Sequence, residues 1–348
     1  MEEMSCCVLA AAKYENKIGF VPINFNMFIM YDYMSGKTTV LPLDKENNSQ
    51  ESLYSCCVEC GQKAVFIPLH GKHFLVVDMD TCELNYIDVP ICNGEKPENC
   101  LFSKGYRIGD FVYAIGYRYP GIVKINMVTE TCESIELEDG LVADGLSYSS
   151  VSDDRDEIIM VTRNNVIIHY SVSSNKVKKI TDFNDGIVWS KVDRTDLWFT
   201  NNIDEMLFRY TKKNGAVEGT KIKCLTERYN KGIYRYVVKY GDKLFVLPEK
   251  NSPIIVYGID GKFLSELWIN RETKNGFSVN GYFAMSGLLY IADNMKKATY
   301  IIDEELNVRE MFFPLNKRLL LNRWMELENN HNVIREGLVK LDSFLSNI

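Results

Sequence analysis

Short runs of apolar, β-favouring residues recur along most of the chain, separated by polar loops. They come in pairs: a first run, a loop of a few residues, and a second run. Runs of this kind, rich in Val, Ile, Phe and Tyr, predict strands. The first runs are residues 19–22, 65–68, 112–115, 159–162, 197–200, 244–248 and 289–292. The second runs are residues 28–32, 74–78, 122–126, 166–170, 206–210, 254–257 and 299–303. The pair therefore occurs seven times, at a spacing of roughly 46 residues, which indicates a solenoid or a propeller.

Two further strands are expected in each unit. A turn sequence follows most second runs, as at Gly36 and Thr81, and a third short strand then begins. No helical period lies between the strands, which excludes a βαβ solenoid. Glycines open another β-rich stretch ahead of the last four units, at Gly145, Gly186, Gly232 and Gly276. Four antiparallel strands per unit, repeated seven times, predict an all-β seven-bladed β-propeller over residues 1–314, because radial closure hides the sheet edges.

The repeat resembles the seven-bladed β-propeller superfamily over roughly residues 4–314. The Trp-Asp ending of WD40 blades and the Gly-Gly of kelch blades are missing from it. The rhythm of strand, loop, strand and Asp turn, as in residues 65–81, is more similar to the loosely defined YVTN and quinoprotein-like propellers. These families include binding scaffolds, lyases and dehydrogenases, so the resemblance implies a fold without choosing a function.

The pattern changes after Pro314, where residues 315–348 are expected to form a C-terminal α-helical extension. Large apolar residues follow alternating steps of four and three, with His331 in the remaining position. They are Leu320, Trp324, Leu327, Ile334, Leu338, Leu341 and Leu345. Residues 329–332 are poor helix formers, so one bent helix and two short helices are both compatible with the sequence. The amphipathic tail either folds onto the rim of its own propeller or is an interaction helix for a protein partner or a second copy of the chain.

The charge and the cysteine content of the chain limit its expected partners and cellular location. The chain has 40 basic and 47 acidic residues and a formal net charge of −7, so it has no general positive field for a phosphate backbone, and nucleic acid is not an expected partner. No run of about 18 apolar residues predicts a membrane span. The acidic N-terminus lacks a signal sequence, and ten scattered cysteines suit reduced thiols, so a cytoplasmic location is expected.

Two cysteines and two histidines are spaced somewhat as in a zinc site: Cys57 and Cys60 are followed by His70 and His73. Residues three apart in a strand point to opposite faces, and the histidine spacing is one residue short of a zinc finger. The sequence therefore predicts no metal site and no cofactor. The acidic run at residues 153–157 is interpreted as a solvated turn. No phosphate loop, nucleophile elbow or metalloprotease helix is found, so an enzyme is less favoured than a binding protein, without being decided.

One surface has a distinctive composition. In a propeller, the loops between the paired runs all lie at one end of the blades, here called the loop face. These loops contain six basic and four acidic residues, so their net charge is positive although that of the whole chain is negative. Loops are generally polar, so this composition alone does not prove a site. The candidate ligand-binding residues on the loop face are His70, His73, Tyr117, Arg118, Tyr119, Arg163, Asn201 and Lys250.

The sequence thus favours a propeller scaffold that acts as a protein-protein interaction or binding module. It would use the loop face and the C-terminal helix. Two alternatives are a propeller that binds a small polar ligand or a glycan, and, less favoured, a lyase or hydrolase that uses the central channel.

Overall fold

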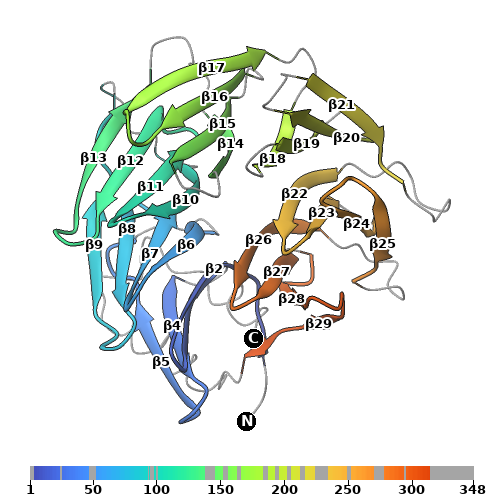
Figure 1. The fold of residues 1–348 in the computed structure, drawn as a ribbon. Coiled ribbons are helices and arrows are strands. Elements are labelled where there is room, and N and C mark those ends of the chain that lie inside the picture. The colour runs from blue at the N-terminus through green and yellow to red at the C-terminus, as the bar shows by residue number, and fades with distance from the viewer. Residues whose placement is uncertain are drawn as a thin grey trace.

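The computed structural model describes residues 4–313, apart from 24–25, 47–51, 93, 95–97, 99–100, 138–145, 152–155, 163–165, 183–186, 193–195, 202–204, 212–215, 224–233, 249–251, 270–277 and 294. The chain forms seven four-stranded antiparallel sheets arranged around a central axis, as Figure 1 shows. Each sheet is one contiguous segment whose strands pair in chain order. The prediction of an all-β seven-bladed propeller with four-stranded blades is confirmed. The proposed helical tail at 315–348, with its seven apolar positions, lies outside the described residues.

The blades run in order around the ring. Blades 1 to 3 are β2 (Val8–Tyr14), β3 (Lys17–Pro22), β4 (Met27–Asp32) and β5 (Lys37–Pro42); β6 (Tyr54–Cys60), β7 (Lys63–Pro68), β8 (His73–Asp78) and β9 (Leu84–Asp88); β10 (Phe102–Ile108), β11 (Phe111–Gly116), β12 (Gly121–Asn126) and β13 (Thr131–Glu136). Blades 4 and 5 are β14 (Leu146–Val151), β15 (Glu157–Thr162), β16 (Val166–Ser171) and β17 (Lys176–Asp182); β18 (Ile187–Val192), β19 (Asp196–Asn201), β20 (Met206–Thr211) and β21 (Ala216–Lys221). Blades 6 and 7 are β22 (Tyr234–Tyr240), β23 (Lys243–Pro248), β24 (Ile254–Gly258) and β25 (Phe263–Leu267); β26 (Val279–Met285), β27 (Leu288–Asp293), β28 (Ala298–Ile302) and β29 (Val308–Glu310).

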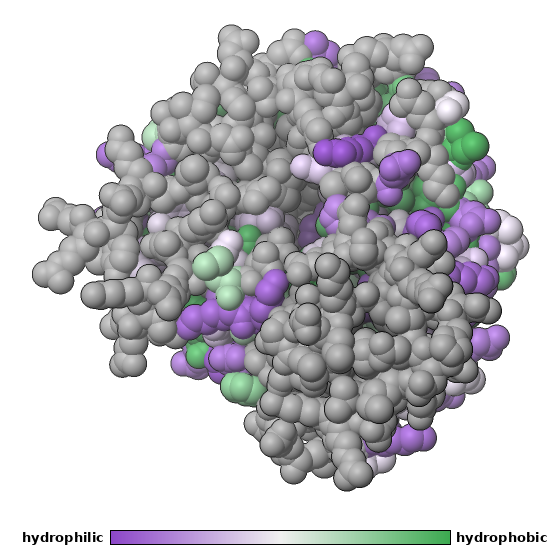
Figure 2. All heavy atoms as spheres, turned by 180° about the vertical axis from the view of Figure 1, so that it is seen from behind, coloured by the Kyte–Doolittle hydropathy of each residue, from purple (hydrophilic) through white to green (hydrophobic). Residues whose placement is uncertain are grey.

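The two middle strands of each blade are the paired apolar runs of the sequence. In blade 2, five of the six residues of β7 and four of the six of β8 are buried, because neighbouring blades cover both faces of the sheet. A strand buried on both faces is continuously apolar and does not alternate. The outermost strands are exposed, as in β21, where no residue is fully buried. In the view from behind (Figure 2), hydrophilic side chains dominate the described periphery, with scattered apolar ones among them.

The core consists of layers between adjacent blades. Phe28 of blade 1 meets Phe66 of blade 2 edge-on, with ring centroids 5.7 Å apart. Phe74 of blade 2 packs on Phe102 of blade 3, with centroids 5.0 Å apart. Similar clusters join blades 3 and 4, 5 and 6, 6 and 7, and 7 and 1. Among the described residues, apolar layers thus join six of the seven pairs of adjacent blades, and apolar burial between blades supplies the main driving force.

The turn after the third strand of a blade is closed by the last residue of that strand. Asp32 Oδ1 accepts hydrogen bonds from the backbone N–H groups of Met34 and Ser35, at 2.9 and 3.1 Å. Asp78 Oδ1 does the same for Asp80 and Thr81, both at 2.9 Å. Such Asx turns satisfy backbone donors locally. They explain the strand-Asp-turn rhythm of the sequence.

The ring closes by a short additional pair of strands. β1 (Met4–Ser5) pairs antiparallel with β30 (Phe312–Phe313), so the two ends of the described chain meet beside blade 7. The sequence pattern did not indicate these two-residue strands. Their pairing ties the ends of the repeat together although every blade is made from its own segment.

A register shift occurs in every blade where the first strand begins. The first strand there carries one residue that has no partner in the second strand. This residue is Leu9, Ser55, Ser103, Ser147, Val188, Arg235 or Asn280 in blades 1 to 7. Bulges of this kind bend a strand and increase its twist. Because the first strands are innermost, the seven bulges surround the central axis at the end where the first strands start. Within the described residues, no helix is long and apolar enough to span a membrane.

Candidate functional site

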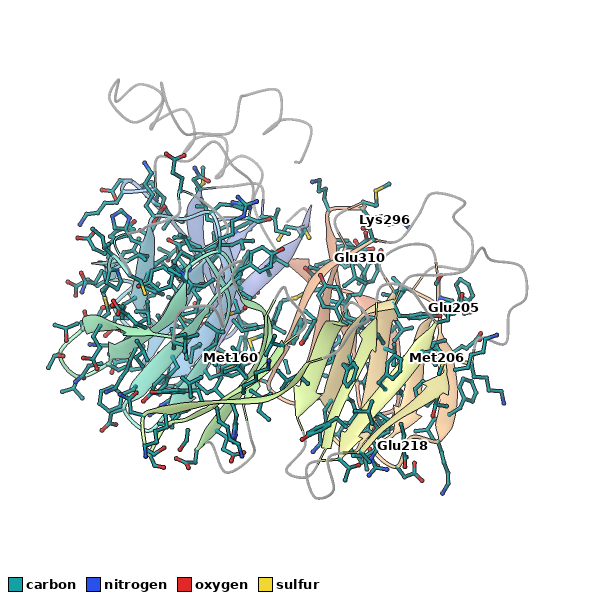
Figure 3. The ribbon with its side chains drawn as sticks, turned by 90° about the horizontal axis from the view of Figure 1, so that it is seen from above. Met160, Glu205, Met206, Glu218, Lys296 and Glu310 are labelled. Carbon is teal, nitrogen blue, oxygen red and sulfur yellow. The ribbon has the colours of Figure 1, made fainter. Side chains whose placement is uncertain are left out.

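The loops between second and third strands share one end of the blades with the connections from blade to blade. Second strands run toward this end and third strands run away from it, so all these loops lie on the loop face. Figure 3 shows the molecule from the side, with Lys296 near this face and Glu218 near the opposite one. The expected placement of the loops follows directly from the strand order.

Backbone hydrogen bonds join the loops of blades 2 and 3. The N–H groups of His70 and Gly71 donate to the carbonyl of Leu53, at 3.1 and 2.9 Å. Leu101 donates to the carbonyl of Leu69 at 2.8 Å, and the N–H of Tyr117 donates to the carbonyl of Leu101 at 2.7 Å. The 69–71 turn and the 117–120 loop are therefore held in a fixed relation through Leu101.

His70 and Arg118 lie close enough in this arrangement to influence each other. His70 is half-buried and Arg118 is exposed. Burial lowers the pKa of His70, and the positive charge of Arg118 lowers it further. Of the candidate residues, the structure thus brings together His70, Tyr117 and Arg118 on adjacent loops. Arg118 and the exposed Lys72 make a small basic surface beside His70 on an acidic chain.

Tyr119 is not a surface residue, which corrects its placement among exposed ligand-binding residues. It is fully buried, and its ring packs on Phe102 with centroids 4.9 Å apart. Burial raises the pKa of its phenol. A Cβ on Gly116 would overlap the carbonyl oxygen of Tyr119, so the loop requires glycine there. The side chain turns inward because its apolar ring gains more from the cavity between blades 2 and 3 than from solvent. Tyr119 anchors the loop that presents Arg118.

His73 is bound on both sides by carboxylates. Its Nδ1 lies 3.0 Å from Oε1 of Glu46, and its Nε2 lies 3.3 Å from Oδ1 of the exposed Asp88. Glu46 is itself buried and accepts hydrogen bonds from the backbone N–H groups of Lys72 and His73, at 2.6 and 2.9 Å. Both ring nitrogens of His73 are occupied. The structure therefore makes His73 a link between the connection at Glu46 and blade 2, and a ligand could reach its ring only by displacing Asp88.

Three other candidates cannot be placed in the site. Arg163 and Lys250 lie outside the described residues, and Asn201 ends β19 with a side chain that is not described. The proposed acidic turn at 153–157 is described only from Asp156 onward.

The four residues of the zinc-like spacing do not converge. Cys60 pairs with Lys63 at the far end of blade 2, whereas His70 follows Pro68, the partner of Tyr54, at the loop face. About six residues of extended strand, roughly 20 Å, separate these ends. Among the residues that the structure describes, no group of three or more His, Cys, Asp and Glu is placed to hold a metal ion.

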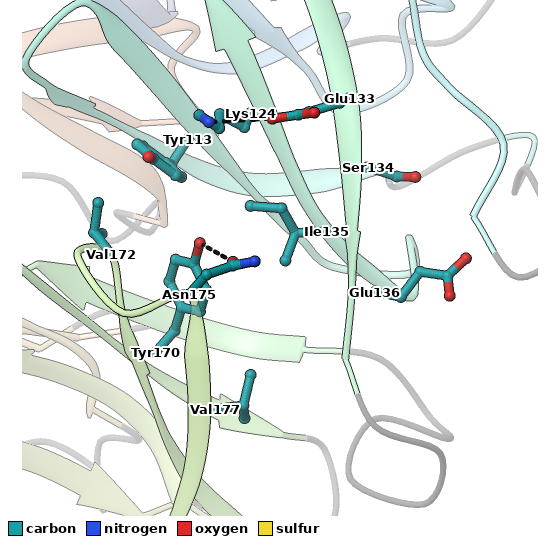
Figure 4. Close-up of a pocket in the computed structure, with 10 residues that line it drawn as sticks. All are labelled: Tyr113, Lys124, Glu133, Ser134, Ile135, Glu136, Tyr170, Val172, Asn175 and Val177. Carbon is teal, nitrogen blue, oxygen red and sulfur yellow. Dashed lines mark hydrogen bonds and ion pairs between the residues drawn. The ribbon is translucent and has the colours of Figure 1, made fainter.

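A groove of about 400 Å³ opens between blades 3 and 4, away from the loop face (Figure 4). Tyr113 and Tyr170 line it, and the hydroxyl of Tyr170 donates to Oδ1 of Asn175 at 2.8 Å. Burial raises the pKa of Tyr170 to about 12. Lys124 at its edge is paired with Glu133 at 3.1 Å. Tyr170, Asn175, Lys124 and Glu133 already have partners within the chain, so the groove offers less to a ligand than the basic surface does.

Two residues that have functional potential, Glu46 and Lys104, were not predicted from the sequence. Glu46 lies in a polar connection without any periodic signal. Lys104 lies in β10, and its charge within an innermost strand was a visible signal, because such strands face neighbouring blades and the central axis.

Comparisons with known proteins support the fold and nothing finer. No family model matches the chain, and no curated protein matches it. Among solved structures it is similar to virginiamycin B lyase from Staphylococcus aureus, with a TM-score of 0.60 and 14% identity over 84% of this chain and 95% of that one. It is also similar to U3-55K, with a TM-score of 0.59 and 10% identity over 82% and 88% of the two chains. A third similar structure is PorZ, a surface component of the type-IX secretion system of Porphyromonas gingivalis, with a TM-score of 0.56 and 12% identity over 89% of this chain and 38% of that one.

Proposed function

We propose that this propeller is a protein-binding module whose loop face, at blades 2 and 3, contacts an acidic segment of its partner. The observation that carries the proposal is the closeness of exposed Arg118 to His70 on two loops that backbone hydrogen bonds hold together. A rigid basic surface on a protein of net charge −7 favours an acidic partner over a basic one.

Apolar side chains on the same end of the molecule support a protein as the partner. Ile91, Met295 and Phe312 are 66%, 63% and 51% exposed, and each belongs to a connection, a loop or a strand end on the loop face. Exposed apolar residues beside charged ones are typical of protein interfaces. The predicted amphipathic segment at 315–348 begins next to Phe312, and it would extend this contact surface.

The test is a quantitative affinity purification with three forms of the protein. The Arg118→Glu variant reverses the charge of the proposed surface. The Arg107→Glu variant makes the same change at the exposed opposite end of β10, and it is the matched control. We expect partners retained by the wild type and by Arg107→Glu to be lost with Arg118→Glu, and their retention to weaken as salt is raised. Equal retention by all three forms would contradict the proposal.

A small polar ligand or glycan on the loop face remains the alternative, and a lyase or hydrolase in the channel is the less favoured one. Propellers of closely similar shape serve different functions, and one structurally similar protein is a lyase. A glycan array separates the first alternative from protein binding. If the wild type binds specific glycans and the Arg118→Glu variant does not, the ligand of the loop face is a glycan and not an acidic protein segment.

A further inference from the structure

Lys104 of β10 reaches across the central axis to the opposite side of the ring. Its Nζ donates a hydrogen bond to the backbone carbonyl of Tyr282 in β26, at 3.3 Å, and lies 4.3 Å from the centroid of the Tyr282 ring. These strands are the innermost strands of blades 3 and 7, which are not neighbours (Figure 1). The contact therefore crosses the central axis of the ring. It lies toward the loop face, because Lys104 directly follows the bulge at Ser103.

The ammonium of Lys104 has no carboxylate partner among the described residues. Lys124 provides a comparison within the chain: its Nζ also lies 4.3 Å from an aromatic centroid, that of Phe111, but it is paired with Glu133 at 3.1 Å. A largely buried cation is normally paired, because desolvation of an unpaired charge is costly. Burial accordingly lowers the pKa of Lys104.

The described groups around Lys104 are aromatic or neutral. The ring of Tyr236 meets that of Tyr282 edge-on, with centroids 5.7 Å apart. Cys56 of blade 2 lies near both Lys104 and Tyr282, and burial raises the pKa of its thiol, so it is a neutral thiol at pH 7. Within the described part of the chain, the surroundings therefore offer one positive charge beside flat apolar surface, and no carboxylate compensates it.

We propose that the centre of the ring at Lys104 and Tyr282, on the side of the loop face, binds a small organic monocarboxylate, whose charged end pairs with the ammonium and whose flat apolar part lies against Tyr282. One N–H of the ammonium is used by the Tyr282 carbonyl, which leaves two donors for the two oxygens of a carboxylate. A single cation matches a single negative charge better than it matches a phosphate, which usually takes several cationic groups. This site is independent of the proposed contact surface at Arg118.

The experiment titrates the full-length protein with benzoate and, in parallel, with benzamide, which has the same shape without the charge. Binding is followed by ligand-observed NMR and by the shift of the Lys104 signal after ¹³C-methylation of lysines. We expect saturable benzoate binding with a dissociation constant of about 1 mM or lower. Benzamide and the Lys104→Met variant should each weaken binding at least about tenfold, or 1.4 kcal/mol. The Lys124→Met variant should bind benzoate like the wild type.

Three results would overturn the proposal. They are the absence of saturable benzoate binding to the wild type, equal binding of benzoate and benzamide, and a preference for inorganic phosphate that depends on Lys104. The first two are measured on the unmodified sequence, so they decide the matter even if Lys104→Met does not fold.

Discussion

Thr299 joins the last blade of the ring to the chain that leads into the first. Its Oγ1 accepts a hydrogen bond from the backbone N–H of Val8 at 3.0 Å and donates one to the carbonyl of Cys6 at 2.9 Å. All these groups are buried, and 291 residues separate Thr299 from Val8. One hydroxyl thus satisfies a donor and an acceptor where the ring closes, close to the β1–β30 pair.

Removal of this hydroxyl should destabilise the closed ring. The Thr299→Val variant keeps the shape but leaves the Val8 N–H and the Cys6 carbonyl without their partner. We expect a loss of about 1–3 kcal/mol in the free energy of unfolding, the cost of buried unsatisfied groups. Urea denaturation followed by fluorescence measures it. The control is Thr131→Val on an exposed strand, which should change stability by less than about 0.5 kcal/mol. Equal effects of the two substitutions would show that Thr299 has no special role.

The two central residues of the 117–120 loop should respond differently to truncation. Tyr119→Ala removes a buried ring packed on Phe102 and should cost about 3–5 kcal/mol. Arg118→Ala changes an exposed side chain and should cost within about 0.5 kcal/mol. Thermal unfolding of both variants checks this, with Tyr33→Ala as an exposed tyrosine control. A small effect of Tyr119→Ala would mean that the loop does not depend on its anchor.

The pKa of His70 predicts a dependence of stability on pH. Because burial and Arg118 lower this pKa below its usual value of 6.5, the folded state favours the neutral imidazole. As pH falls below 6.5, the unfolded chain takes up a proton that native His70 resists, so this residue's contribution to stability declines. The Arg118→Gln variant should raise the pKa of His70 and reduce the decline.

An NMR titration of the His70 ring protons in both forms measures these pKa values directly. Arg118→Lys, which retains the charge, is the control and should resemble the wild type. A His70 pKa at or above 6.5 in the wild type would refute the prediction.

The C-terminal tail remains a prediction from sequence. If residues 315–348 bind another chain, truncation after Pro314 should leave a folded propeller of monomer mass, whereas the full-length protein should be larger or retain a partner. The buried stripe should contribute roughly 1.5–3 kcal/mol per large apolar residue to that association. Light scattering of both forms provides the measurement. A monomeric full-length protein whose truncated form unfolds would instead identify the tail as a lid on its own propeller.

Local chemistry decided the parts of the structure that could be read from the sequence. Strands buried on both faces must be apolar throughout, so the paired runs marked the second and third strands of all seven blades. The turns were equally readable, because the side chains of Asp32 and Asp78 bond to backbone groups only two and three residues away. The position of the loop face followed from strand order alone. The short β1 and β30 strands were missed, since two residues carry no periodicity.

The tertiary structure decided how these local pieces meet. Tyr119 and Arg118 are adjacent in a polar loop, and only the cavity beside Phe102 determines that one is buried and the other exposed. His73 is bound by Glu46 and Asp88, which come from an irregular connection and from the end of another strand. Lys104 meets Tyr282 across 178 residues of sequence, because closure of the ring places blades 3 and 7 on opposite sides of one axis. Patterns along a chain report the faces on which each residue is buried, but they carry no record of which distant residue lies opposite, and the candidate sites of this protein depend on those partners.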